Sequence, residues 1–152
     1  MSEDLLLRNI ADRLAIGDVL SRYATIVDTR EWSALSEVFT EDATVDYTST
    51  GGKAGSVASV MEWLDRALAP WPVNLHCITN ISIEFEGDRA TSRAYFHAPM
   101  ASGELGDQLV ITNAGTYDDR WTRTPAGWRI DGRVCRQTLM LGSLPEGYAI
   151  PD

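Results

Sequence analysis

The stretch NLHCITNISIEFEGDRATSRAYFHAPMA, residues 74–101, holds the pattern that best indicates the fold. Its two halves are rich in β-branched and aromatic residues, which favour strands. Between them stands Gly87-Asp88, a dipeptide typical of tight turns. The pattern predicts an antiparallel hairpin whose strands cover 74–86 and 90–101.

The second strand of this hairpin has two unlike faces. Alternation places Arg93, Tyr95 and His97 on one face, whereas the other face carries only small or apolar side chains. A mixed polar and aromatic face of this kind can lie against solvent or line a cavity. The sequence leaves both interpretations open.

The residues before the hairpin follow a helical period. Over about residues 2–28, apolar side chains recur at three- and four-residue steps and predict a long helix. Shorter helices are predicted at 31–39 and at 56–68, the latter with Ser56 as its N-cap. A strand is expected between them, at 44–50.

Two further strands are expected after the hairpin, at 109–123 and 127–141, before an irregular tail at 142–152. Helices followed by antiparallel strands are typical of an α+β fold, with helices on one face of a curved sheet. The chain contains no repeat, low-complexity segment or linker. One domain over 1–152 is therefore expected, with its core at about 8–141.

Composition and charge narrow the possible functions. The 152 residues are 44% hydrophobic and 23% charged, with a net charge of −9. This acidic balance argues against nucleic acid and against an anionic membrane surface, because both attract basic proteins. No apolar run reaches the roughly 18 residues of a membrane span. Acids occupy the N-terminus, where a signal peptide carries basic residues, and only two cysteines occur, so we expect a cytoplasmic protein.

Motifs for metal or cofactor binding are absent from the sequence. The two histidines, His76 and His97, form no HxH or HExxH pattern, so no metal site is expected. The glycine-rich run at 51–55 lacks the spacing of a phosphate-binding loop and indicates a turn. No cofactor is therefore expected.

Asp28 stands where the first helix is expected to end. A carboxylate there faces the negative end of the helix dipole, at a cost of a few tenths to about 1 kcal/mol. Water, the nearby Arg30 or a buried partner such as a histidine could compensate this cost. Tyr23 could supply a phenol that donates to an oxygen gaining negative charge. It lies about 140° from Asp28 on an ideal helix, so both reach one pocket only if the helix bends or ends between them.

His76 begins a strand directly after a helix that Pro70 and Pro72 terminate. It is either a satisfied core or edge histidine or an acid/base group, because imidazole can move protons near neutral pH. Cys77 follows it but points to the opposite face of the strand. This alternation disfavours a cysteine–histidine nucleophile pair, and Cys77 is expected in the core.

The order and spacing of several short segments give the chain a family resemblance. From about residue 8 to 138 it resembles the SnoaL-like branch of the nuclear-transport-factor-2-like superfamily. The segments that carry the resemblance are Ala15-Ile16, Tyr23, Asp28, Trp32, Asn74-Leu75-His76, Asn80, 93–97, 115–119 and 127–130. The family implies a cone-shaped α+β barrel, in which N-terminal helices pack on a strongly curved, mostly antiparallel sheet that encloses a pocket.

The resemblance also implies roles for individual residues. The catalytic members that the chain is similar to are scytalone dehydratase, bile-acid 7α-dehydratase and hexachlorocyclohexane dehydrochlorinase, all cofactor-free lyases with an aspartate–histidine pair. By this resemblance His76 is the base and Asp28 its orienter. Tyr23 and His97 assist the departure of a hydroxyl or polarise a carbonyl. The residues expected on the pocket wall, each also compatible with an ordinary core, are Trp32, Phe39, Trp63, Trp71, Tyr95 and Tyr117.

The function expected on these grounds is a cofactor-independent, dehydratase-like lyase that acts on a neutral, mostly apolar cyclic or polyketide-like small molecule. An isomerase or cyclase of the same fold is one alternative, and a non-catalytic binding module is another. A homo-oligomer is expected because an open sheet face needs cover, and the family resemblance implies a dimer or a trimer. The tail is expected to close the pocket or to contact a neighbour through Leu144, Tyr148 and Ile150.

Overall fold

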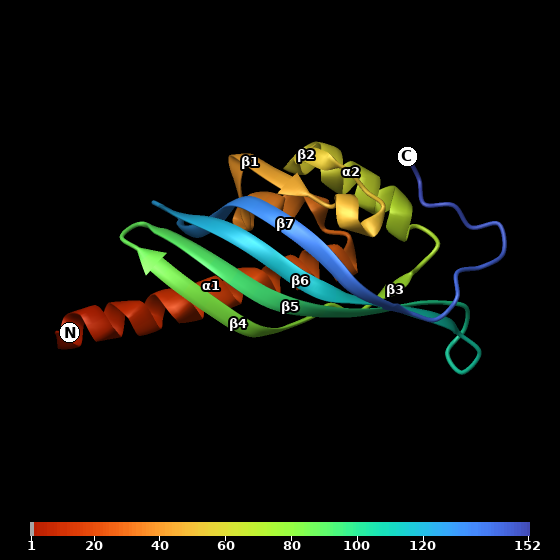
Figure 1. The fold of residues 1–152 in the computed structure, drawn as a ribbon, viewed down its shortest axis with the longest axis horizontal. Helices are drawn as coiled ribbons and strands as arrows, with labels where there is room; N and C mark the ends of the chain where they lie inside the picture. Colours follow the sequence, from red (N-terminus) through yellow and green to blue (C-terminus); the bar gives the residue numbers. More distant parts are fainter. Residues whose placement is uncertain (1) are drawn as a thin grey trace.

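The computed structural model describes residues 2–152 and shows N-terminal helices packed on a strongly curved sheet that forms a half-barrel. Figure 1 shows α1 running along one face of the sheet, and α2 beside β1 and β2 near the C-terminal tail. This arrangement confirms the predicted α+β fold class. The elements in chain order are α1 (Glu3–Thr29), η1 (Trp32–Glu37), β1 (Phe39–Asp46), η2 (Thr48–Thr50), β2 (Ala54–Ser56), α2 (Val57–Leu68), β3 (Val73–Asn74), β4 (Cys77–Glu86), β5 (Arg89–Ser102), β6 (Leu109–Thr124) and β7 (Gly127–Leu141).

The sheet has seven strands in the order β2-β1-β7-β6-β5-β3, and β4 pairs with β5 on the same side as β3. The pair β1–β7 is parallel and all the other pairs are antiparallel. The predicted hairpin is confirmed as β4–β5, with Glu86 paired to Arg89 next to the turn. The long strands β5, β6 and β7 form the curved wall.

Both α-helices begin at a serine N-cap, and the N-cap predicted at Ser56 is confirmed. The Ser2 hydroxyl accepts a hydrogen bond from the Leu5 N–H at 3.3 Å, and the Ser56 hydroxyl accepts one from the Ser59 N–H at 3.3 Å. These bonds satisfy N–H groups that have no partner inside the helix. Helix α1 continues without a break to Thr29.

Three predicted boundaries differ from the structure. The strand expected at 44–50 runs instead over Phe39–Asp46, because the Asp46 carboxylate accepts from the Thr48 N–H at 2.9 Å and turns the chain there. The helix expected at 31–39 is a short 3₁₀ helix. The edge strand expected at 74–86 is interrupted at residues 75–76, between β3 and β4.

The core contains one buried ion pair beneath the apolar layer. Arg133 and Asp119 are both fully buried, and their two hydrogen bonds each measure 2.7 Å. The Arg133 guanidinium lies over the rings of Tyr23 and Tyr117, 4.2 and 4.1 Å from their centroids. Such a charge is tolerated inside a protein because it is paired and hydrogen-bonded.

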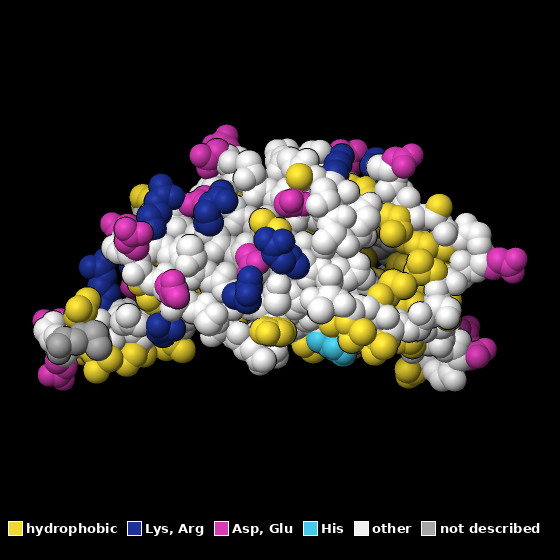
Figure 2. Space-filling model, in the orientation of Figure 1, with side chains coloured by type: hydrophobic (Ala, Val, Ile, Leu, Met, Phe, Trp, Pro, Cys, Tyr) yellow, Lys and Arg dark blue, Asp and Glu magenta, His cyan; other side chains and the backbone are white. Residues whose placement is uncertain are grey.

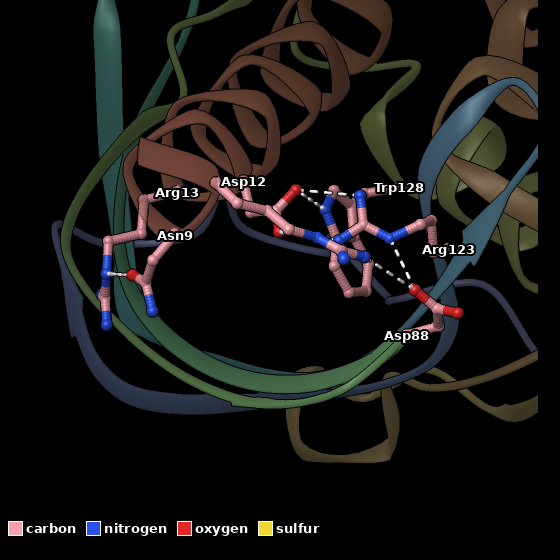
Figure 3. Close-up of polar contacts among 7 residues, drawn as sticks. Asn9, Asp12, Arg13, Asp88, Arg123 and Trp128 are labelled. Carbon is pink, nitrogen blue, oxygen red and sulfur yellow. Dashed lines mark hydrogen bonds and ion pairs between the residues drawn. The ribbon is translucent and has the colours of Figure 1, made fainter. Parts of the chain in front are cut away.

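A second polar cluster joins the N-terminal half of α1 to the far end of the sheet (Figure 3). The Asp12 carboxylate accepts two hydrogen bonds from Arg123, at 2.9 and 2.7 Å, and one from the Trp128 indole at 3.0 Å. Arg123 also donates to Asp88, at the turn of the hairpin, at 2.8 Å. Within residues 2–152, no helix has both the length and the apolar character needed to cross a membrane.

Candidate active site

The interruption between β3 and β4 turns His76 out of the strand pairing. The Leu75 N–H still bonds to the Pro99 carbonyl of β5 at 3.1 Å, but the His76 N–H donates to the Asp28 carboxylate at 2.9 Å. Arg30 fixes the approach to this point by donating to the carbonyls of Leu68 and Trp71 at 2.8 and 3.0 Å. The end of α1 therefore determines where His76 lies.

Asp28 and His76 form a close pair. The Asp28 Oδ1 atom lies 2.6 Å from His76 Nδ1, and the two side chains are 21% and 9% exposed. A carboxylate only accepts hydrogen bonds, so the proton in this hydrogen bond is on Nδ1. His76 lines the cavity, and among the described residues its Nε2 atom makes no hydrogen bond, so this nitrogen is free for a ligand. His76 thus compensates the charge of Asp28 at the helix end, whereas Arg30 donates to the backbone carbonyls of Leu68 and Trp71.

His76 lines a cavity of about 130 Å³ that is mainly apolar. Figure 2 shows hydrophobic side chains gathered in a hollow at the end of the molecule where the C-terminal tail lies. An engineered apolar cavity of about 150 Å³ accepts benzene, so this volume suits one ring. Besides His76, the cavity is lined by Tyr23, Tyr47, Thr50, Trp63, Leu64, Ala67, Leu68, Trp71, Phe96, Ala98, Met100, Ile111, Asn113, Tyr117, Cys135, Gln137, Met140, Leu144, Tyr148 and Ile150.

Two phenols are paired at the wall of this cavity. The hydroxyls of Tyr23 and Tyr47 lie 2.5 Å apart. Burial raises the pKa of Tyr23 and raises that of Tyr47 well above its ordinary value, so both phenols stay protonated and can donate. The Arg133 guanidinium behind the Tyr23 ring adds positive charge to this side of the pocket. A group that binds here is favoured if it carries an oxygen with partial negative charge.

The sequence did not lead us to expect Tyr47 in the site, although its alternation with Val45 indicated a buried side chain. Tyr47 follows Val45 by two positions in the segment 44–50, and both side chains are buried. Tyr23 and Asp28 occupy one continuous helix, which neither bends nor ends between them. Both residues belong to one site all the same, because Asp28 is hydrogen-bonded to His76 and His76 lines the cavity.

Three of the aromatic residues predicted for the pocket line it: Trp63, Trp71 and Tyr117. Phe39 and Trp32 are not among its described lining residues. Phe39 packs edge-on against Tyr23, with ring centroids 6.0 Å apart, and so supports the wall from behind. Trp32 lies near the surface, where its indole N–H donates to Asp65 at 2.8 Å.

The structure contradicts the expectation that Tyr95 and His97 belong to the pocket. Both side chains are exposed on the outer face of β5, whereas Phe96 and Ala98, which alternate with them, line the cavity. Cys77 is also exposed and pairs with His97 across the strands, so its expected place in the core is wrong. The alternating pattern assigned these side chains correctly to the two faces of β5. It does not indicate which face lies on the concave side of the sheet.

The C-terminal tail closes one side of the cavity. Leu144, Tyr148 and Ile150 all line it. Three hydrogen bonds hold the tail against α2. The Trp63 indole N–H donates to the Pro151 carbonyl at 2.8 Å, the Tyr148 hydroxyl donates to the Ala67 carbonyl at 3.2 Å, and the Arg66 guanidinium donates to the Asp152 backbone oxygen at 3.0 Å. Of the two expectations for the tail, pocket closure is the one this arrangement meets.

Comparison with known proteins places the chain in a family. It belongs to the SnoaL-like domain family, whose model matches residues 8–134. It is 39% identical over 140 residues to uncharacterized proteins of Mycobacterium tuberculosis and Mycobacterium bovis, covering 90% of this chain and 94% of each relative.

Solved structures agree with this placement. The Kfla4162 protein from Kribbella flavida is 25% identical, with a TM-score of 0.74 over 88% of this chain and 95% of that one. A scytalone dehydratase candidate from Novosphingobium aromaticivorans has a TM-score of 0.75 at 21% identity, over 93% and 97%. The hexachlorocyclohexane dehydrochlorinase LinA-type3 from Novosphingobium barchaimii has a TM-score of 0.72 at 20% identity, over 95% and 99%. At this level of sequence identity, the last two structures show a shared fold and nothing more.

Proposed function

We propose that the protein is a cofactor-independent lyase, of dehydratase type, acting on a neutral, mostly apolar one-ring molecule. The observation that carries this proposal is the Asp28–His76 pair, joined by two hydrogen bonds, at the edge of a mainly apolar cavity. Structural neighbours that are named as a dehydratase candidate and a dehydrochlorinase support the lyase class. The small cavity narrows the cyclic or polyketide-like substrate expected from sequence to a single ring.

The proposed reaction starts with proton removal by His76. Nε2 takes a proton from a carbon beside a carbonyl, and the electrons of that C–H bond form the new C=C bond. The C–O bond of a hydroxyl on the next carbon then breaks, and the leaving oxygen takes the proton back from the His76 imidazolium, so that one water is lost and the neutral imidazole is restored. Asp28 stabilises the imidazolium in between, and such general base catalysis contributes about 10²–10⁴-fold.

The phenol pair supplies the second half of the chemistry. In the Tyr23–Tyr47 hydrogen bond one hydroxyl donates to the other, which keeps its own proton for the substrate. That proton can stabilise negative charge on a carbonyl oxygen or on the departing hydroxyl. Both phenols are buried, and electrostatic stabilisation by a buried donor is worth more than in water, because the local dielectric constant is low.

An isomerase is the second candidate. His76 is the one histidine among the described cavity-lining residues, so a proton that it removes can return from the same nitrogen to a different carbon. The mass of the product distinguishes the two reactions, because dehydration removes one water and isomerisation leaves the mass unchanged. A protein that binds ring ketones without converting them would be a binding module instead.

A screen of hydroxylated cyclic ketones, followed by mass spectrometry, tests the proposal. Wild-type protein is expected to release water from at least one of them, and His76→Ala is expected to abolish this while retaining the fold. His97→Ala is the matched control, since His97 is exposed on the outer face, and its turnover is expected to match that of wild type. Unchanged turnover in His76→Ala would overturn the proposal.

A further inference from the structure

The cavity contains a second polar group, which the proposed reaction does not use. Asn113 of β6 and Gln137 of β7 both line it, and the Gln137 side-chain amide donates to the Asn113 carbonyl oxygen at 2.6 Å. Most of the remaining wall is apolar or aromatic. Both residues are half-buried, and amides in a mainly apolar wall offer a ligand hydrogen-bonding groups that the rest of the wall lacks.

The sheet register places this amide pair across from His76. Asn74 pairs with Met100 and Cys77 with His97, so His76 lies beside Ala98 of β5. Ala98 in turn pairs with Asn113 on β6. Adjacent strands are about 4.8 Å apart, so the backbones at His76 and Asn113 are separated by about 10 Å.

The residue between them leaves room for a ligand. Ala98 presents only a methyl group to the cavity that it lines with His76 and Asn113. A six-membered ring over that methyl has the imidazole at one edge and the amides at the other. The cavity volume of about 130 Å³ fits the same one-ring occupant.

The hydrogen-bonding capacity of the pair defines what it recognises. Among the described residues, the bond between the two amides is the only hydrogen bond that either amide side chain makes. Whichever of the two amides donates, three N–H groups and one carbonyl of the pair keep no side-chain partner. A hydroxyl can pair with this carbonyl and with one of these N–H groups, because it both donates and accepts. An apolar group in its place leaves both amide groups unsatisfied.

We infer that Asn113 and Gln137 form a specificity site for a hydroxyl group carried on the ring edge opposite the one that faces His76. The chemical class of ligand is therefore a hydroxylated six-membered ring ketone. Which carbon reacts rests on the function proposed above, whereas recognition of the hydroxyl does not. Asn113 and Gln137 are positioning residues in this scheme, and His76 remains the base.

The experiment compares two probes of similar size, 4-hydroxycyclohexanone and 4-methylcyclohexanone, by calorimetric or NMR titration. Wild-type protein is expected to bind the hydroxyl probe more tightly, by on the order of tenfold for two hydrogen bonds. Asn113→Leu and Gln137→Met are each expected to remove this preference, and circular dichroism checks their folding. Thr112→Val is the control, because the Thr112 side chain lies on the opposite face of β6, and it is expected to keep the wild-type ratio.

Each outcome is decisive. An unchanged ratio of affinities in both folded variants, or failure of wild type to bind either probe, would overturn the inference. His76→Ala separates this inference from the proposed function, because it is expected to abolish turnover while the ratio of affinities stays as in wild type. Turnover that survives in His76→Ala, together with a ratio that Asn113→Leu removes, would overturn the reaction and support the specificity site.

Discussion

Asp28 holds His76 at two points, because one carboxylate oxygen lies 2.6 Å from Nδ1 and the other accepts the backbone N–H at 2.9 Å. The first contact selects the tautomer and the second fixes the chain at the strand interruption. A single side chain at the end of α1 thus determines both the direction and the protonation pattern of the ring. Asp28 therefore positions His76 in addition to acting as its counter-ion.

Asp28→Asn is expected to lower kcat by about 10²–10⁴-fold, with a much smaller change in KM. An amide N–H facing Nδ1 favours the other tautomer, with the proton on Nε2, and the equivalent change in a serine-protease triad costs about 10⁴-fold. The substrate found in the ketone screen serves for steady-state kinetics. Asp18→Asn is the control, because Asp18 is an exposed carboxylate on the same helix. Equal kcat values for Asp28→Asn and wild type would contradict the role given to Asp28.

Tyr23→Phe and Tyr47→Phe are expected to separate the two halves of the reaction. Each removes one hydroxyl of the pair, and loss of a donor to a developing oxyanion costs about 10²–10³-fold in kcat. His76 is untouched, so exchange of the substrate C–H proton with deuterated solvent is expected to continue when water loss slows. NMR measures the exchange and mass spectrometry the product. Parallel loss of both activities would mean that the phenols stabilise the carbonyl oxygen during proton removal and not the departing hydroxyl.

The sequence contained enough to predict the layers of this fold and one half of its site. Helical and alternating periods distinguished α1 and α2 from the hairpin. The dipole argument at Asp28 left water, Arg30 or a buried partner such as a histidine as alternatives, and the structure has His76 in that place. The sequence could not show which face of β5 lines the cavity, because side chains alternate in the same way whichever face of the sheet is concave. Tyr95 and His97 were misplaced for that reason.

Other features depended on contacts between segments far apart in the chain. The strand interruption at His76 exists because its N–H bonds to Asp28, 48 positions earlier. The burial of Arg133 depends on Asp119 and on two aromatic rings. Charged residues are mostly exposed in proteins, so nothing in the local sequence marks this one as part of the core.

The cluster around Asp12 predicts a dependence of stability on pH. Hydrogen bonds from Arg123 lower the pKa of the Asp12 carboxyl below its ordinary value of 3.8. A depressed carboxyl pKa stabilises the fold above the unfolded pKa, and this contribution is lost as the pH falls through the lower folded value. At pH 7, Asp12→Asn is expected to reduce the free energy of unfolding by about 1–3 kcal/mol. The difference from wild type is expected to shrink below about pH 4 in urea titrations.

Asp42→Asn is the matched control for this prediction, since Asp42 is exposed on β1. Its unfolding free energy is expected to stay within about 0.5 kcal/mol of wild type, as for most surface substitutions. A difference between Asp12→Asn and wild type that is the same at pH 3 and pH 7 would show that the carboxylate charge is not what stabilises the cluster.

The tail that closes the cavity is expected to limit the size of the ligand. Tyr148 packs edge-on against Trp71, with ring centroids 6.2 Å apart, and Ile150 lies directly over Gly51. The double variant Tyr148→Ala/Ile150→Ala removes this wall, so its affinity for a two-ring ketone such as tetralone is expected to rise at least tenfold. Affinity for one-ring probes is expected to fall, because they lose apolar contacts. Titration of both probes gives the comparison, with Glu146→Ala, an exposed tail residue, as control. A double variant that still rejects tetralone would show that other cavity walls determine the limit.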